Sequence, residues 1–349
     1  MNDSQQMDTL LWLGPSTMHM RRVALPTLTT GEVLIKVSAV GICGSELSGY
    51  LGHNSLRKPP LIMGHEATGR VVQTTEGTFA DGSATREGVR VTFNPLISCG
   101  ECDRCRANRP NLCRKRQIIG VHRAGAFAQF VAVPANQCYA LPNALSESMA
   151  SLAEPLACAV RAVSLARVRA EDTLLILGAG PIGLFCLAAA RAMGIEHVLI
   201  TDVSPARLAV AERWGATSVI NAHASNVVSE VARLKPGGVD AVIDAVGANM
   251  TRKQAVEAVV PGGQVVYIGL HDEESSLAAN YLVRQEIAVT GSFAYTPADF
   301  EQAFDFLVQG LLHADPSWLE ERPLAEGAKA FEELIAGTAP VTKIILRVA

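Results

Sequence analysis

The chain has 349 residues, of which 49% are hydrophobic, so it can bury a large core that we expect to be divided between two domains. Its 30 Lys and Arg against 34 Asp and Glu give a net charge of −4, and no long segment is dominated by Lys or Arg. This balance argues against nucleic acid or a membrane as a partner. The chain shows neither a long uncharged apolar run nor a basic-then-apolar start, so we expect no membrane span, no signal peptide and a cytoplasmic location.

The N-terminal part of the chain contains short β-rich runs that Gly and Pro separate. These runs occupy residues 31–40, 67–74, 88–93 and 127–134. Such runs predict a partly antiparallel barrel.

Candidate metal ligands lie between and after these runs. They are Cys43 in GICGSE, His65 and Glu66 in GHE, and Glu154 in AEPLACA. One thiolate, one imidazole and one or two carboxylates are the ligand mixture of a catalytic zinc site with an open position. Taken singly, Cys43 could fill an apolar core, His65 could lie in a turn, and Glu154 could cap a helix. The residues alone leave these alternatives open.

Four of the eight cysteines stand in one loop, with the spacing C-x2-C-x2-C-x7-C. They are Cys99, Cys102, Cys105 and Cys113. The last gap does not fit the bacterial iron–sulfur run, and a nucleic-acid zinc ribbon needs two distant C-x2-C pairs. Four free thiols in so short a loop would be an oxidation hazard. The spacing therefore favours a structural zinc that is closed to substrate.

A nucleotide-binding pattern begins at residue 172 with an apolar run, a glycine turn and a helix. Gly178, Gly180 and Gly183 form G-x-G-x-x-G, and a second strand ends at Asp202. Glycines in this turn let the backbone approach a pyrophosphate, and the carboxylate binds the adenosine ribose. Asp202 could instead be a solvated strand-end residue or a helix cap. A carboxylate here would repel a 2′-phosphate, which favours NAD over NADP, and Arg207 is expected to border the adenine. The candidate cofactor-binding set is Gly178, Gly180, Pro181, Ile182, Gly183, Asp202, Arg207, Val246 and Gly269.

The alternation of strands and helices continues to residue 291. Strand-like runs at 217–220, 239–247, 262–270 and 286–294 enclose helical patterns at 225–234 and 249–259. Six strands with crossover helices predict a doubly wound parallel sheet. Afterwards the sequence predicts an amphipathic helix at 299–310 and a final strand at 342–348.

The order of the motifs along the chain carries a family resemblance. The motifs are GICGSE, GHEATG, the four-cysteine loop, GAFAQFVAVP, EPLACA and GAGPIG. Over essentially its full length the chain resembles zinc-dependent medium-chain alcohol dehydrogenases, and most nearly the polyol branch of sorbitol, threonine and galactitol-phosphate dehydrogenases. The resemblance implies an α/β protein in which a GroES-like β-rich catalytic domain, residues 1–156 and 292–349, is split around a Rossmann domain, residues 157–291. The active site is expected in the cleft.

The resemblance also implies residue roles. Cys43, His65 and Glu154 would bind the catalytic zinc, and Glu66 would be an alternate or water-linked ligand. A carboxylate at position 154, where the alcohol dehydrogenase branch usually has cysteine, is typical of the polyol branch. Ser45 resembles the hydroxyl that passes a proton towards the ribose, although it could be a loop serine that bonds backbone.

One position departs from the pattern. Many relatives place a histidine five residues after the first ligand to finish the relay, and this chain has Ser48 there, with His53 nearby in sequence. The exit path of the proton is left open. Aromatic residues that could line the substrate pocket by resemblance are Tyr50, Phe93, Phe293 and Tyr295.

The function implied is hydride transfer between NAD and a polyol or other secondary alcohol, phosphorylated sugar alcohols included. The implied enzyme carries two zinc ions per chain, acts on a small-molecule alcohol or ketone, and forms a homodimer or homotetramer. The alternatives are a zinc-independent enone or quinone reductase and a non-enzymatic, crystallin-like relative of the fold.

Overall fold

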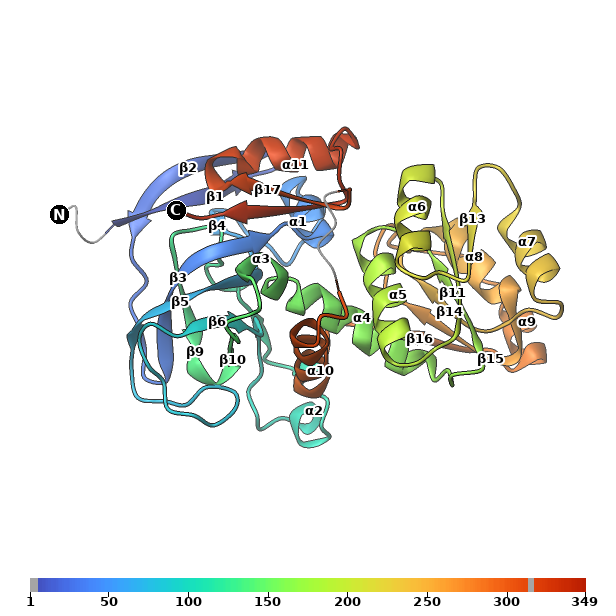
Figure 1. Cartoon of the computed structure of the whole chain (residues 1–349), viewed down its shortest axis with the longest axis horizontal. Coiled ribbons are helices and arrows are strands. Elements are labelled where there is room, and N and C mark those ends of the chain that lie inside the picture. The colour runs from blue at the N-terminus through green and yellow to red at the C-terminus, as the bar shows by residue number, and fades with distance from the viewer. Residues whose placement is uncertain (1–5, 313–316) are drawn as a thin grey trace. The chain divides into compact units, whose positions relative to one another are not determined.

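The computed structural model describes residues 6–312 and 317–349, which form two compact units (Figure 1). The first unit comprises the chain up to Glu154 and again from Leu307, and the second unit runs from Pro155 to Phe306. The sequence-based boundaries at 156/157 and 291/292 remain a prediction.

The first unit is built on a seven-stranded sheet with β3 at its centre. The strand order is β10-β6-β5-β3-β18-β17, and β9 also pairs with β3. The strands are β3 (Glu32–Gly41), β5 (Glu66–Thr74), β6 (Arg90–Phe93), β9 (Phe130–Pro134), β10 (Cys138–Ala140), β17 (Leu319–Pro323) and β18 (Lys343–Arg347). Except for the parallel pair β17–β18, the pairings are antiparallel, so the predicted β-rich unit is confirmed.

The position of β3 follows from its composition. Its run EVLIKVSAVG is buried along almost its whole length, as expected for a strand with neighbours on both sides. Val33, Ile35 and Val37 point into the core of this unit.

Smaller elements complete the first unit. A three-stranded sheet of order β2-β1-β4 joins Gln6–Gly14 (β1), Thr17–Ala24 (β2) and Leu61–Ile62 (β4), and a two-stranded one joins Leu96–Ile97 (β7) and Gln117–Ile118 (β8). The helices are α1 (Gly44–Tyr50), α2 (Asp103–Arg106), α3 (Glu147–Ala150), α11 (Gly327–Ala336) and the 3₁₀ turns η2 (Pro110–Leu112), η3 (Ala135–Gln137) and η4 (Leu324–Glu326). Strands β1, β2 and β17 and helix α11 were not predicted from the sequence patterns.

The second unit is a six-stranded parallel sheet of order β13-β12-β11-β14-β15-β16, with helices on both faces (Figure 1). Its strands are β11 (Thr173–Leu177), β12 (His197–Asp202), β13 (Ser218–Asn221), β14 (Val239–Asp244), β15 (Val259–Tyr267) and β16 (Ala288–Gly291). Its helices are α4 (Ala153–Ala166, which begins at the boundary), α5 (Pro181–Ala192), α6 (Pro205–Arg213), α7 (Val227–Leu234), α8 (Asn249–Ala258), α9 (Ala279–Gln285) and α10 (Pro297–Val308, which ends past it). The order reverses direction at β11, so the predicted doubly wound sheet is confirmed.

Among the described residues, one helical stretch, residues 147–166, is long and apolar enough to cross a membrane. However, 72% of the most apolar part of this stretch is buried inside the protein, as in the core helix of a folded domain.

Candidate active site and metal centres

Three of the predicted zinc ligands converge in the first unit. The ligand atoms of Cys43, His65 and Glu66 all lie within 4.8 Å of one another. Cys43 is the N-cap of α1, His65 directly precedes β5, and Glu66 is the first residue of that strand. His65 and Glu66 are buried, whereas Cys43 is half-buried. A thiolate, an imidazole and a carboxylate that face one point suit a zinc ion with an open position.

The backbone conformation at Gly64 determines where the next residue, His65, is placed. Gly64 has φ +99°, and a Cβ on it would lie 2.6 Å from the backbone nitrogen of Phe127. Backbone bonds from Ala126 to Gly64 and from Phe127 to Met63 hold the two segments together. The GHE motif therefore requires its glycine for close packing against the GAF segment.

Glu46 connects the two ligand loops, a role that the sequence analysis missed. Its Oε1 accepts from the backbone of Gly64 and lies 2.8 Å from Nδ1 of His65, while its Oε2 accepts from the backbone of Cys43 at 3.1 Å. Burial opposes the charge of Glu46, but the facing imidazole and Arg57 hold the pKa of Glu46 below its usual value. Burial likewise opposes protonation of His65, but the charge of Glu46 raises the pKa of His65 well above its usual value. With Nδ1 engaged, Nε2 is left for a metal.

Glu66 has a second partner at the far end of the chain. Its Oε2 forms an ion pair with Nζ of Lys343, which also donates to the carbonyl of Ile42 at 3.0 Å. Both side chains are almost fully buried. The other oxygen, Oε1 of Glu66, is buried and has no hydrogen-bond partner within the described residues. A buried oxygen without a partner next to a thiol and an imidazole fits a metal site.

The relay candidate Ser45 lies beside the first ligand. Its Oγ is 3.4 Å from Sγ of Cys43 and accepts from Nη2 of Arg57 at 3.2 Å. Ser48 is half-buried on the same helix, and His53 is exposed.

Glu154 lies in the first turn of α4 and is 9% exposed. Within the described residues, the structure does not place it in the group formed by Cys43, His65 and Glu66. Its role as a zinc ligand remains a prediction.

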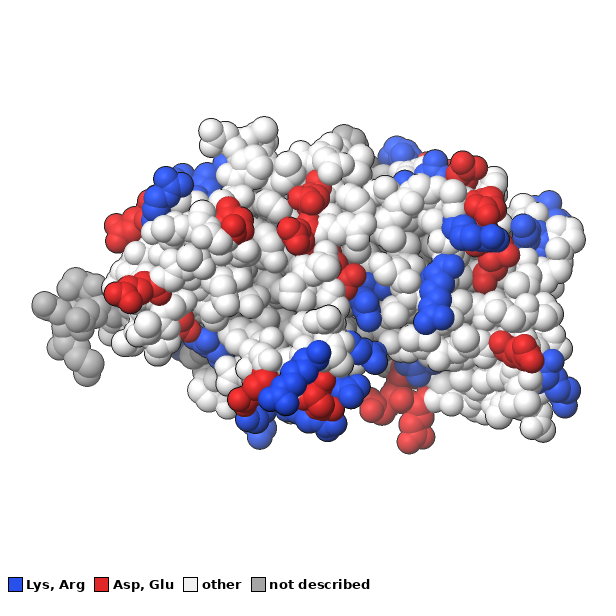
Figure 2. All heavy atoms as spheres, turned by 90° about the horizontal axis from the view of Figure 1, so that it is seen from below, with Lys and Arg blue, Asp and Glu red and all other residues white. Residues whose placement is uncertain are grey.

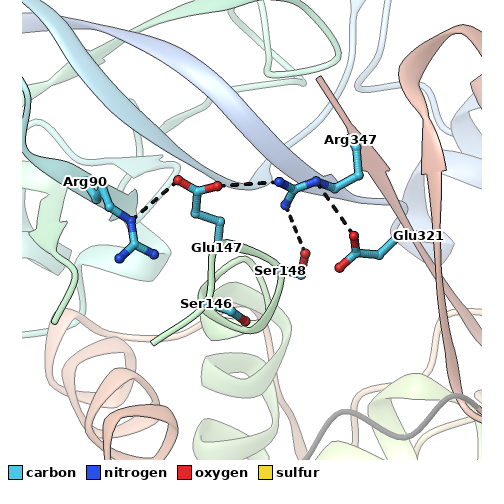
Figure 3. Close-up of a pocket in the computed structure, with 6 residues that line it drawn as sticks. All are labelled: Arg90, Ser146, Glu147, Ser148, Glu321 and Arg347. Carbon is cyan, nitrogen blue, oxygen red and sulfur yellow. Dashed lines mark hydrogen bonds and ion pairs between the residues drawn. The ribbon is translucent and has the colours of Figure 1, made fainter. Parts of the chain in front are cut away.

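A pocket of about 450 Å³ lies near the segment that leads to α4 (Figure 3). Arg90 and Arg347 flank Glu147 at 3.5 and 3.6 Å, and Arg347 also reaches Glu321 and the hydroxyl of Ser148. These pairs tie strands β6, β17 and β18 to α3. The charges of the lining residues balance, and none of the predicted zinc ligands lines the pocket, so we assign it a structural role.

The four-cysteine group forms a second candidate metal centre. The Sγ–Sγ distances are 3.4 Å for Cys99–Cys113, 3.6 Å for Cys102–Cys105, 3.9 Å for Cys102–Cys113 and 4.0 Å for Cys99–Cys105. Tetrahedral zinc with ordinary Zn–S bonds would separate its sulfurs by about 3.8 Å. Backbone N–H groups of Arg114 and Cys105 lower the pKa of Cys102 to about 6, whereas burial and the hydrogen bond with Cys102 raise that of Cys105 to about 11. A divalent cation would allow all four thiols to ionise.

The predicted phosphate-binding turn lies between β11 and α5. Gly180 is the N-cap of α5, Pro181 is the first residue of this helix, and half-buried Ile182 follows. A Cβ on Gly183 would lie 1.7 Å from the carbonyl oxygen of Gly178, whereas one on Gly180 would meet nothing within 4 Å. Gly183 thus serves helix–strand packing, and Gly180 leaves open space above the helix N-terminus, where a pyrophosphate binds in this motif.

The other predicted cofactor-binding residues lie at the carboxyl ends of neighbouring strands. A Cβ on Gly178 would meet the side chain of Val246 at 2.6 Å, and one on Gly269 would meet the backbone of Val246 at 2.2 Å. Asp244, which the sequence analysis missed, accepts from the backbone of Val246 and Gly247, both at 2.9 Å. Burial nevertheless raises the pKa of Asp244 above its usual value.

Asp202 ends β12, as predicted. Its Oδ2 accepts from the backbone of Ala179 at 2.7 Å, and its Oδ1 accepts from the backbone of Ser204 at 2.9 Å. The guanidinium of Arg207 lies 3.8 Å from Oδ2. The carboxylate therefore stands beside the glycine turn, where a ribose would be recognised.

The aromatic residues suggested for the pocket are mostly core residues. Tyr50 and Phe93 are buried in the first unit, where Tyr50 packs against Phe331 with ring centroids 5.5 Å apart. Tyr295 is buried against Phe300, and only Phe293 is half-buried.

Comparison with known proteins identifies the family. Residues 29–143 match the family described as alcohol dehydrogenase GroES-like domain, and residues 181–309 match zinc-binding dehydrogenase. D-arabitol-phosphate dehydrogenase of Enterococcus avium is 32% identical over 90% of this chain and 90% of its own. Sorbitol dehydrogenase of Bacillus subtilis is 31% identical over 89% of this chain and 88% of its own.

Solved structures are similar over almost the whole chain. A zinc-binding dehydrogenase of Sinorhizobium meliloti bound to NADP has 32% identity and a TM-score of 0.88, covering 98% of this chain and 99% of that one. An alcohol dehydrogenase of Escherichia coli complexed with NADH has 28% identity and a TM-score of 0.90, with the same coverage. The predicted family and fold class are thus confirmed. The chain belongs to the zinc-dependent medium-chain alcohol dehydrogenase family, in its polyol branch, and is an oxidoreductase that uses zinc and a nicotinamide cofactor.

Proposed function

We propose that the protein transfers a hydride between NAD and a polyol or other secondary alcohol, with one catalytic and one structural zinc ion in each chain. The convergence of Cys43, His65 and Glu66, separate from the four-cysteine group, carries the proposal. The names of the two relatives, arabitol-phosphate and sorbitol dehydrogenase, support a sugar alcohol as substrate, phosphorylated or not.

Cys43 and His65, with Glu66 or Glu154, would hold the catalytic zinc, which supplies Lewis acidity toward the substrate hydroxyl when bound. Glu46 orients the imidazole of His65, and Lys343 fixes one oxygen of Glu66. Ser45 stands beside Cys43 and takes the proton that the substrate hydroxyl releases. The charges support such a centre: Glu46 faces His65, Glu66 faces Lys343, and a divalent cation would balance the thiolate of Cys43 and the carboxylate of Glu154.

The choice of NAD is supported by Asp202. A 2′-phosphate next to this carboxylate would be repelled, and the nearby guanidinium of Arg207 is already shared with the acid. The S. meliloti relative binds NADP and the E. coli one binds NADH, so the preference depends on residues of this chain.

A homodimer or homotetramer is proposed because β16 is an edge strand with exposed residues. Val283 on the nearby helix α9 is 76% exposed. An exposed apolar side chain beside an edge strand is expected where a second subunit covers this surface. The eight cysteines, none of which forms a disulfide within the described residues, support a cytoplasmic location. On the face shown in Figure 2, basic and acidic side chains are interspersed, which supports a small molecule rather than nucleic acid or a membrane as partner.

The test is reduction of NAD and of NADP with a panel of polyols, polyol phosphates and simple secondary alcohols, before and after zinc removal. Zinc-dependent turnover with NAD and a polyol is expected. Turnover that survives complete loss of zinc, or that occurs only with enones, would contradict the proposal.

A further inference from the structure

Arg57 is a buried residue whose guanidinium reaches the N-terminal end of α1, where Cys43 and Ser45 lie. It follows that helix in sequence, is 5% exposed, and packs against Gly49. A Cβ on Gly49 would lie 2.7 Å from Cδ of Arg57, so the glycine provides the space for this side chain.

The side-chain hydrogen bonds of Arg57 within the described residues both go to Ser45. Nη1 donates to the carbonyl oxygen of Ser45 at 3.0 Å, and Nη2 donates to its Oγ at 3.2 Å. A guanidinium carries only donors, so Oγ of Ser45 must be the acceptor in this bond. The single hydroxyl hydrogen of Ser45 is then free to point to the metal-ligand side, where Sγ of Cys43 lies 3.4 Å away.

Fold stability alone does not account for this arrangement. Arg57 has no ion pair among the described residues, and its buried Nε has no hydrogen-bond partner there. Its charge acts on Glu46 only from a distance, where it helps to keep the pKa of that acid low. A buried charge without an ion-pair partner is costly, so a role at Ser45 is a physical reason for keeping it.

We propose that Arg57 is a positioning residue: it occupies one lone pair of Oγ of Ser45 and holds this hydroxyl beside Cys43, where the other lone pair can accept the proton that the substrate hydroxyl releases. The inference rests on the proposed role of Ser45 as the relay hydroxyl. It also concerns the departure at Ser48, because Arg57 contacts Ser45 in a chain that lacks the expected histidine. Unlike a histidine, a guanidinium does not accept a proton, so Arg57 orients Ser45 and the proton leaves by another route.

A double-mutant cycle with Arg57→Met and Ser45→Ala tests the inference. The readouts are the single-turnover rate of NAD reduction with a polyol substrate, its solvent deuterium isotope effect, and the zinc content. Each single change should lower the rate about tenfold to a hundredfold, as expected for loss of a hydrogen bond to a charged group. The double variant should be no slower than Ser45→Ala, with two zinc ions retained throughout.

A second variant covers the case in which Arg57→Met folds poorly. Gly49→Ala keeps the arginine but displaces it, and it should lower the rate and change the isotope effect in the same direction. Arg21→Met is the control and should behave as the unchanged protein, because this exposed side chain bonds, within the described part of the chain, only the adjacent carbonyl of Met20.

Three results would overturn the inference. If Ser45→Ala slows the reaction while Arg57→Met and Gly49→Ala do not, or if the losses multiply in the double variant, Arg57 does not act through Ser45. If Ser45→Ala itself has no effect, the proposed relay role fails, and the inference fails with it.

Discussion

Lys343 and Glu66 form a buried ion pair across the end of β3, above a position that has no side chain. Glu66 is opposite Gly41 in the β3–β5 pairing, and Lys343 begins β18, which flanks β3 on its other side. A Cβ on Gly41 would lie 2.2 Å from Oε2 of Glu66 and 3.2 Å from Cε of Lys343. The first and last parts of the chain thus meet at one candidate metal-binding carboxylate.

Lys343→Met should destabilise the zinc-free protein strongly, because Glu66 would remain buried without its partner. We expect a loss of about 3–5 kcal/mol in the free energy of unfolding, measured by urea denaturation. The double variant Lys343→Met/Glu66→Gln, which removes both charges, should recover part of that loss. Equal destabilisation of the single and double variants would show that the ion pair is not the cause.

Asp202→Ala should weaken NAD binding and relax the discrimination against NADP. The ribose loses an acceptor, a 2′-phosphate loses a repelling charge, and Arg207 becomes available to it. Steady-state kinetics with both cofactors measure the ratio of kcat/KM, and an unchanged ratio would count against the assignment of Asp202.

The local motifs predicted much of this molecule. Alternating and apolar runs predicted the sheets, and spacing predicted the cysteine group, because both patterns are set by neighbours in sequence. The hairpin β1–β2 was missed because its strands, QMDTLLWLG and TMHMRRVA, carry little regular alternation. The short helix α9 was missed because its residues are mostly exposed and give no amphipathic pattern.

The sequence motifs could not predict which residues from other segments contact the candidate zinc ligands. Glu46 is part of the GICGSE motif and is the third helical residue after the N-cap Cys43. This capping-box position could have predicted its hydrogen bond to the backbone of Cys43. Arg57 and Lys343 reach the site only through the packing of distant segments, and no spacing rule links Lys343 to Glu66.

Glu154→Gln should lower the zinc affinity of the catalytic site about tenfold or more, with a matching fall in kcat, because an amide is a poorer ligand than a carboxylate. Competition with a chelator measures the affinity. Glu257→Gln, at an exposed acid on α8, is the matched control and should change neither quantity. If Glu154→Gln binds zinc normally while Glu66→Gln does not, Glu66 is the third ligand.

The stability contributed by Glu32 should depend on pH. Burial opposes its charge, but the backbone of Thr29 and the guanidinium of Arg123 hold the pKa of Glu32 below its usual value. A carboxyl group whose pKa is lowered on folding stabilises the protein above the unfolded pKa of roughly 4.3, and this contribution disappears as the pH falls through the folded value. Glu32→Gln should therefore cost about 1 kcal/mol at pH 7, and the cost should shrink as the pH falls below roughly 4.3 and through the folded pKa. Melting temperatures of both proteins across this range measure the effect; a constant difference would contradict it.

The zinc content and activity of Cys43→Ser and Cys113→Ser, measured side by side, test the two-centre account most directly. Cys43→Ser should lose one zinc ion and nearly all turnover while keeping its melting temperature within a few degrees, because only the open site is affected. Cys113→Ser should lose the other zinc ion together with thermal stability, because a closed structural site contributes to folding. A Cys43→Ser protein that retains two zinc ions and reduces NAD at the normal rate would contradict the account.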